Sequence, residues 1–281
     1  MELERLTHAD DFLAAAGDFL TAREAEHNLI LGLSSRLRDS PRLYGEDPYF
    51  LVVRDRGRVV AAALRTPPHN LILSETADDR TTEAICAAAH QAFPTLPGVI
   101  GPSEVAAAFA RAWPARTGAW ASLAIAQRVY RADSAVHPHG VEGRMRPYAD
   151  SDEELVLAWL DAFAAEAIRG SPIEDGPSML RHRLEDPDGD FVIWEHDAPV
   201  SVAGYGGATP NGIRIGPVYT PPELRRRGYA SALTARLTQT LLDGGRRFCF
   251  LFTDLANPTS NAIYQRIGYE PVTDVDFWRF E

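Results

Sequence analysis

The sequence predicts an α/β protein in which two similar units follow each other along the chain. Three observations carry this prediction. Short apolar or alternating runs, typical of strands, recur between stretches whose apolar residues have helical spacing. The same order of these elements occurs in both halves of the chain. The length of 281 residues and the 45% hydrophobic composition suffice for two domains with substantial cores.

The first half contains an apolar-periodic helix over residues 10–20 and a hairpin over residues 50–65. A short apolar stretch, Leu71–Leu73, follows the hairpin. The acids between Glu75 and Asp79 then favour a helix start, but they would repel an anion there. We therefore expect this half to lack an anion-binding turn at that helix start.

The second half repeats the plan with a helix over residues 151–163 and a hairpin over residues 191–205. Residues 133–143, which include His137 and His139, are the best candidate for a linker between the halves. No further Cys/His cluster accompanies the two histidines, so no metal site is predicted there.

A strand, a turn and a helix follow the second hairpin. Residues 213–219 alternate like a strand, and Pro221 and Pro222 end it. Residues Leu233, Leu237 and Leu241 give the next helix one apolar stripe, and a pair of glycines at 244 and 245 provides its stop. The helix is therefore expected to begin near Gly228.

The turn before this helix has the composition of an anion site. The first turn of a helix has backbone N–H groups without acceptors, and the helix dipole makes that end partly positive. Gly228 allows close approach of an oxygen-rich group, and the arginines before it add charge. An arginine-flanked helix start on the surface is the alternative for these residues alone. The turn reads Arg225-Arg226-Arg227-Gly228-Tyr229-Ala230.

A second polar constellation follows a buried strand predicted over residues 248–252. A short helix fits between Pro258 and Gly268. Asn257, Asn261 and Tyr264 have the spacing that places side chains on one face of this helix. A core tyrosine with a satisfied hydroxyl is the alternative for Tyr264.

Taken together, residues 218–269 resemble the coenzyme-binding core of the GNAT superfamily of acyl-CoA-dependent N-acyltransferases. The resemblance implies two tandem GNAT-like units, each a mixed, strongly twisted sheet flanked by helices. It implies a degenerate unit over residues 1–135 and an acyl-CoA-binding catalytic unit over residues 144–281. The first unit would pack on the second and help to shape the acceptor pocket.

The resemblance also assigns roles to residues. Main-chain groups of the strand would contact pantetheine, the turn and helix start would hold the diphosphate, and Asn257 would contact the pantetheine arm. Tyr264 becomes the general acid. The implied coenzyme-binding residues are Val218, Tyr219, Thr220, Arg225, Arg226, Arg227, Gly228, Tyr229, Ala230, Ser231, Asn257 and Asn261.

The general base is less clear, because residues 204–216 contain no carboxylate, whereas many family members place a glutamate near there. Glu166 is the first candidate, and Glu174, Asp175 and Tyr205 are alternatives.

The function implied is transfer of an acetyl or short acyl group from acetyl-CoA to a primary amine of a small molecule or peptide, without a metal. A non-catalytic acyl-CoA sensor and a transferase that uses aminoacyl-tRNA are the alternatives. The net charge of −11 disfavours nucleic acid as a partner.

Cytoplasmic location is expected, because no apolar run reaches the roughly 18 residues of a membrane span and residues 1–5 lack the pattern of a signal peptide. The two cysteines, Cys86 and Cys249, fall in a predicted helix and a predicted core strand. They are too few for a disulfide framework or a zinc site. The acceptor amine and the oligomeric state are left open by the sequence.

Overall fold

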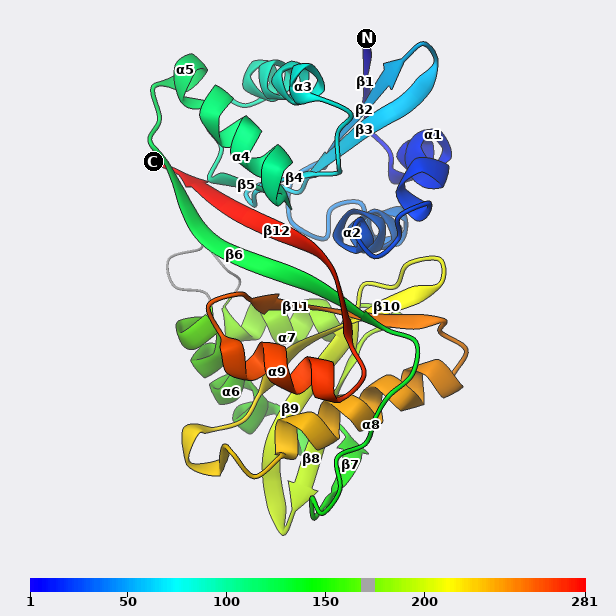
Figure 1. The fold of residues 1–281 in the computed structure, drawn as a ribbon, viewed down its shortest axis with the longest axis vertical. Coiled ribbons are helices and arrows are strands. Elements are labelled where there is room, and N and C mark those ends of the chain that lie inside the picture. The colour runs from blue at the N-terminus through cyan, green and yellow to red at the C-terminus, as the bar shows by residue number, and fades with distance from the viewer. Residues whose placement is uncertain (168–174) are drawn as a thin grey trace. The chain divides into compact units, whose positions relative to one another are not determined.

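The computed structural model describes residues 1–167 and 175–281, so the base candidate Glu174 lies outside the described residues. The chain forms two compact units (Figure 1). Unit 1 comprises Met1–Arg128 and Thr273–Glu281, and unit 2 comprises Val129–Val272. Both boundaries fall inside strands, because β6 (Ala121–Ala132) and β12 (Glu270–Phe280) each begin in one unit and end in the other.

Unit 1 is a sheet with helices on both faces. Its strands pair in the order β1-β2-β3-β4-β5-β12, antiparallel except for the parallel pair β4 and β5. Phe50 and Val52 of β2 pack with α1 and α2, whereas Leu51 and Val53 pack with α3 and α4. Besides β6 and β12, the elements are β1 (Glu2–Leu6), α1 (Ala9–Thr21), α2 (Asn28–Asp39), β2 (Tyr49–Asp55), β3 (Arg58–Arg65), β4 (Leu71–Leu73), α3 (Asp79–Ala92), β5 (Gly98–Pro102), α4 (Ser103–Ala112) and α5 (Pro114–Thr117).

Unit 2 has the same construction. Its strands pair in the order β7-β8-β9-β10-β11, antiparallel except for the parallel pair β10 and β11. Phe191 and Ile193 of β8 pack with α6 and α7, whereas Val192 and Trp194 pack with α8. The elements are β7 (Arg144–Pro147), the 3-10 helix η1 (Asp150–Asp152), α6 (Glu153–Ala167), α7 (Gly176–Leu184), β8 (Asp190–His196), β9 (Ala198–Gly206), β10 (Gly212–Tyr219), η2 (Pro222–Leu224), α8 (Tyr229–Asp243), β11 (Phe248–Asp254) and α9 (Pro258–Arg266).

The order of elements repeats between the units. Each has one strand, two helices, three strands, a helix, a strand and a further helix, so that β1 to α4 correspond to β7 to α9 (Figure 1). In each unit the helix α3 or α8 connects the two parallel strands. The predicted α/β class, with tandem units that each contain a mixed sheet flanked by helices, is confirmed.

The elements predicted around the phosphate-binding turn are also confirmed. The alternating run over residues 213–219 lies in β10, and the run over residues 248–252 lies in β11. Helix α8 has Gly228 as its N-cap and Gly244 as its C-cap. Helix α9 starts at Pro258, with Asn257 as its N-cap. These boundaries follow the local signals because proline restricts the backbone directly and glycine adopts the left-handed conformation that other residues avoid.

The predicted linker, residues 133–143, contains no helix or strand. It is nevertheless fixed to unit 2, because the N–H of Val136 donates to the carbonyl oxygen of Ile267 at 2.9 Å. The indole Nε1 of Trp194 donates to the carbonyl oxygen of Glu142 at 3.0 Å. Both cysteines are buried and free, Cys86 in α3 and Cys249 in β11. Within the described ranges, no helix combines the length and the hydropathy that a membrane span needs.

Candidate active site

The candidate site of unit 2 begins where the parallel strands β10 and β11 separate. They pair from Gly212 opposite Phe248 to Arg214 opposite Phe250. Both strands continue beyond this point, β10 to Tyr219 and β11 to Asp254, without further pairing between them in the described chain. Ligands of open α/β sheets bind at such carboxyl ends, because separated strands leave main-chain groups free to bond.

A β-bulge shapes β10 at the opening. The register with β9 shifts between Ile215 and Val218, and Gly216 has a φ of 144°. Arg183 of α7 donates from Nη2 to the carbonyl oxygen of Gly216 at 2.7 Å, which holds the bulge from outside the sheet. The sequence predicted no role for Arg183, because nothing in the pattern of α7 shows which backbone group its guanidinium reaches.

The predicted pantetheine-binding residues lie at the end of β10. Val218 is opposite Ala203 of β9. The carbonyl oxygen of Tyr219 accepts a hydrogen bond from Ser201 Oγ at 2.9 Å, and that of Thr220 accepts one from Arg225 Nε at 2.8 Å. Both carbonyls therefore already have an internal donor.

The predicted phosphate turn exposes a run of unpaired backbone N–H groups. The first hydrogen bond of α8 runs from the N–H of Ala232 to the carbonyl oxygen of Gly228 at 2.9 Å. The N–H groups of residues 226–231 have no acceptor among the described residues. Arg226 and Gly228 have φ values of 63° and 86°, and such alternation of left- and right-handed residues turns successive N–H groups toward one point. Such an arrangement at a helix N-terminus suits an anion such as a diphosphate.

The side chains of Arg226 and Arg227 add charge to this turn. Both are exposed, and neither forms an ion pair with a described residue. Ala230 and Ser231 lie in the first turn of α8 and are half-buried. The structure therefore brings together, at one helix start, the main-chain donors and the cations that the sequence predicted.

The start of α8 is held by contacts with residues of β8 and of the segment before β7. Tyr229 is buried, and its hydroxyl lies 2.8 Å from Nδ1 of His196, at the end of β8. A Cβ atom at position 228 would lie 2.8 Å from Cγ2 of Val141. Tyr229 thus contributes its N–H to the turn, while its side chain positions the helix. The sequence indicated neither partner, since Val141 and His196 are distant along the chain.

Arg225 and Glu166, which the sequence assigned to phosphate binding and to base catalysis, lie opposite each other. Nη2 of Arg225 is 3.0 Å and 2.7 Å from the two carboxylate oxygens of Glu166. The same guanidinium bonds to the carbonyl oxygen of Thr220. The structure thus places Glu166 in an ion pair that holds the turn against α6, rather than as a free carboxylate, and Arg225 as a positioning residue.

We expect Glu166→Gln to change kcat for acyl transfer less than about 5-fold and to raise KM for acetyl-CoA about 2- to 5-fold. Half-exposed ion pairs contribute roughly 0–1 kcal/mol, so the loosened Arg225 should affect the turn only modestly. Steady-state kinetics measure both constants. Glu154→Gln, an exposed glutamate of the same helix, is the matched control. A 100-fold loss of kcat with normal KM would instead establish Glu166 as the base.

The asparagines of the second constellation have different surroundings. Asn257 caps α9, accepting a hydrogen bond from the N–H of Ser260 at 3.1 Å. The amide nitrogen of Asn261 donates to the carbonyl oxygens of Asp254 and Asn257, each at 2.8 Å. Its oxygen accepts from the hydroxyl of Tyr130 at 3.0 Å. Asn261 therefore positions the loop after β11, whereas the amide nitrogen of Asn257 has no partner among the described residues and suits the predicted contact with pantetheine.

Tyr264 of α9 is half-buried, and its ring meets that of Tyr269 at 6.1 Å between centroids. Burial raises the pKa of Tyr264 to about 12. Its hydroxyl makes no hydrogen bond to a described residue, whereas the hydroxyl of Tyr269 lies 2.7 Å from Oγ1 of Thr238. Tyr269 is thus a bonded core tyrosine, and Tyr264 is a neutral phenol with its proton available to a ligand.

The corresponding helix start of unit 1 is closed. The side chain of Asp78, the N-cap of α3, accepts hydrogen bonds from the N–H and the hydroxyl of Thr81, each at 2.9 Å. These bonds, first of all the one from the N–H, lower the pKa of Asp78. A carboxylate therefore occupies the place that an anion takes at an open helix start. Among the described residues, no group of three or more His, Cys, Asp or Glu side chains could hold a metal ion.

Comparisons with known proteins agree with this arrangement. Residues 155–269 match the model of the acetyltransferase (GNAT) family. Comparison with curated proteins gives no match. The fold is similar to that of a tandem GNAT protein from the clavulanic acid biosynthesis pathway, at 16% identity over 99% of this chain and 98% of that chain, with a TM-score of 0.58.

Two further solved structures have the same fold. One is a GCN5-related N-acetyltransferase from Sphaerobacter thermophilus, at 17% identity over 99% of this chain and 95% of that chain, with a TM-score of 0.59. The other, from Kribbella flavida, is a GCN5-related N-acetyltransferase at 17% identity over 89% of this chain and 95% of that chain, with a TM-score of 0.57. Residues 155–269 therefore match the acetyltransferase (GNAT) family model, in a chain whose fold is similar to that of a tandem GNAT protein.

Proposed function

We propose that unit 2 transfers an acetyl or short acyl group from acetyl-CoA to a primary amine of a small molecule or a peptide. The observation that carries the proposal is the run of unpaired N–H groups over residues 226–231, flanked by the free guanidinium groups of Arg226 and Arg227. Main-chain donors, a helix dipole and two cations at one point suit the diphosphate of the coenzyme.

In this proposal the rest of the coenzyme lies along the opening between β10 and β11. The pantetheine amides bond to main-chain groups of β10 near Val218 and to the amide of Asn257. A backbone N–H near Val218 donates to the thioester oxygen, which gains charge when the amine attacks. The amine nitrogen forms the new bond to the carbonyl carbon, and the carbon–sulfur bond breaks, so no covalent enzyme intermediate forms.

Tyr264 acts as the general acid, giving its proton to the departing sulfur. Because burial raises the pKa of Tyr264 to about 12, the phenol keeps its proton at neutral pH and can donate it as negative charge develops on the sulfur.

The described acids near the predicted acceptor side are already engaged. Glu166 pairs with Arg225, and Asp175 caps α7 by accepting from the N–H of Ser178 at 2.9 Å. Hydrogen bonds from Ser178 lower the pKa of Asp175. We therefore propose that the amine attacks as its neutral form, so that the rate rises with pH through the pKa of the amine.

Release of CoA thiol from acetyl-CoA, measured over a panel of amines, amino acids and peptides with free N-termini, tests the proposal. Arg227→Glu should raise KM for acetyl-CoA roughly 10- to 100-fold, because a carboxylate replaces a charged donor beside the diphosphate. Arg236→Glu, an exposed arginine of the same helix, makes the same charge change away from the turn and should leave KM unchanged.

The protein's own thiols should add little background to this assay, since burial raises the pKa of Cys86 to about 11 and that of Cys249 to about 12. An unchanged KM for acetyl-CoA in Arg227→Glu would show that acetyl-CoA does not bind at this turn. Calorimetric binding of acetyl-CoA without transfer to any amine in the panel would favour a non-catalytic sensor of acyl-CoA. Transfer only from an aminoacyl-tRNA would favour the larger donor.

A further inference from the structure

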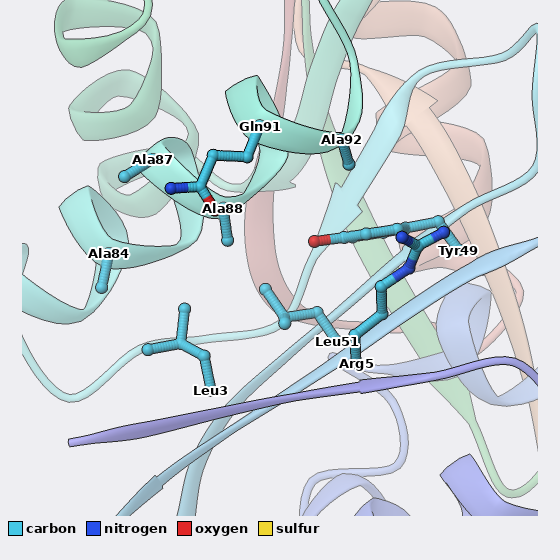
Figure 2. A pocket seen from close by; sticks show the side chains of 9 residues that line it. All are labelled: Leu3, Arg5, Tyr49, Leu51, Ala84, Ala87, Ala88, Gln91 and Ala92. Carbon is cyan, nitrogen blue, oxygen red and sulfur yellow. The ribbon is translucent and has the colours of Figure 1, made fainter.

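Unit 1 contains a pocket of about 520 Å³ between its first two strands and α3. Figure 2 shows Leu3 and Arg5 of β1 and Leu51 and Tyr49 of β2 on one side, and side chains of α3 on the other. A volume in this range is typical of sites for small ligands. The pocket lies under the second half of α3, whereas the capped helix start at Asp78 is at the other end of that helix.

The space exists because α3 presents short side chains toward the strands. Ala84, Ala88 and Ala92 have the spacing of one helix face, and all three line the pocket. In unit 2 the elements β7, β8 and α8 contribute large side chains to one hydrophobic cluster, among them Met145, Trp194, Leu241 and Leu242. In unit 1 the alanines of α3 leave the pocket open on this side.

The polar side chains that line the pocket are those of Arg5, Tyr49 and Gln91, and each of them can donate a hydrogen bond. The guanidinium of Arg5 lies 5.4 Å from the ring centroid of Tyr49 and forms no ion pair with a described residue. In Figure 2 the hydroxyl of Tyr49 points into the space between the strands and α3. Burial raises the pKa of Tyr49, so its hydroxyl remains a donor at neutral pH.

Among the described residues, no acid lines this pocket. The acids of β1 lie on the opposite face of the strand, because side chains alternate, and Glu4 there pairs with Arg54. The guanidinium of Arg5 is exposed and has no carboxylate partner among the described residues, so it is available to pair with the carboxylate of a ligand. A short apolar body on that ligand would fill the space beside Leu3, Leu51 and Ala88.

We propose that this pocket of unit 1 is a binding site for a small monocarboxylic acid with an apolar body, whose carboxylate bonds to Arg5, Tyr49 and Gln91 while its apolar part lies against Leu3, Leu51 and the alanines of α3. The site is separate from the coenzyme turn of unit 2. It gives unit 1, whose own helix start is closed, a ligand of its own.

Calorimetry and saturation-transfer NMR with hexanoate, hexanamide and hexylamine test this proposal in the full chain, with saturating CoA present to occupy the coenzyme site. Hexanoate should bind roughly tenfold or more tightly than hexanamide, and hexylamine should not bind, because the pocket offers a cation and no acid. Arg5→Gln should weaken hexanoate binding by a similar factor. Gln91→Glu, which adds a repelling carboxylate at the rim, should abolish it.

Arg5 and Gln91 are both exposed, so these substitutions should leave the melting temperature unchanged. Arg58→Gln removes the same charge from an exposed position outside the pocket and should bind hexanoate like the unaltered protein. The proposal is overturned if hexanoate does not bind, if hexanamide binds equally well, or if Arg5→Gln and Arg58→Gln bind hexanoate alike. None of these measurements depends on acyl transfer, so they test this proposal independently of the proposed function of unit 2.

Discussion

Tyr264→Phe is expected to lower kcat for acyl transfer roughly 100- to 1,000-fold while leaving the Kd for acetyl-CoA unchanged. Proton transfer by a positioned side chain contributes typically 10²- to 10⁴-fold to rate. The substitution removes only the hydroxyl, which has no hydrogen bond to a described residue, and keeps the ring that contacts Tyr269. Stability should therefore change little, and the loss should appear in the chemical step.

The pH dependence separates this role from a structural one. Because burial raises the pKa of Tyr264 to about 12, the phenol is protonated throughout the range below about pH 10. The rate of the unaltered protein should then rise as the amine loses its proton and remain level up to about pH 10. A fall of activity around pH 9, with no fall in stability, would contradict an acid with this pKa.

Tyr148→Phe is a suitable control for these measurements. Tyr148 is also half-buried in unit 2 and packs with the cluster on the α6 face of the sheet, opposite the cluster that contacts Tyr264. The control substitution removes one phenol hydroxyl from the same unit, at a position away from the proposed chemistry. Equal kcat in Tyr264→Phe and Tyr148→Phe would remove Tyr264 from the acid role.

The parts of the fold that the sequence predicted well are those defined by local signals. Pro221, Gly228 and Gly244 mark the end of β10 and both ends of α8, because each restricts or frees the backbone where it stands. The helical spacing of apolar residues in α8 could be recognised without knowing the surface against which the helix packs. Other elements were not predicted, among them α4, β5 and the long strand β6.

The partners within the candidate site could not be predicted in the same way. Arg225 and Glu166 are 59 residues apart, and each alone has the chemistry of the role that the sequence gave it. Only the fold shows that the two side chains form an ion pair with each other. Asn261 was placed correctly on its helix, but its bond to Tyr130 spans 131 residues. Spacing along one helix says which side chains share a face and nothing about what that face meets.

The division of the chain carries the same lesson. Residues 273–281 belong to unit 1, where β12 pairs with β5 from Val275 opposite Pro102 to Arg279 opposite Gly98. A terminal strand has no local feature that selects its sheet, since alternation fits any half-buried edge. By contrast, the different helix starts of the two units were readable, because Asp78 and Gly228 are themselves the groups that close or open them.

Gly228→Ala is expected to weaken binding of acetyl-CoA roughly 10- to 100-fold. The residue has a φ of 86°, which costs an L-residue about 1–2 kcal/mol. The new Cβ would also lie 2.8 Å from Cγ2 of Val141. To relieve both, the backbone of the turn must rotate, and rotation turns the N–H groups of residues 226–231 away from their common point. Isothermal titration calorimetry measures the loss directly.

Gly245→Ala separates the loss of the anion site from backbone strain. Gly245 lies just beyond the other end of α8 with a φ of 101°, and a Cβ there meets no atom within 4 Å. Gly245→Ala should lower stability by about 1–2 kcal/mol through strain alone, and Gly228→Ala should lower it by more because of the added contact, but only Gly228→Ala should weaken binding. Adding Val141→Ala to Gly228→Ala removes the contact and not the strain, so it should recover part of the affinity. If Gly228→Ala loses stability while binding acetyl-CoA normally, the N–H groups of this turn do not hold the diphosphate, because they cannot keep their directions when the backbone at position 228 moves.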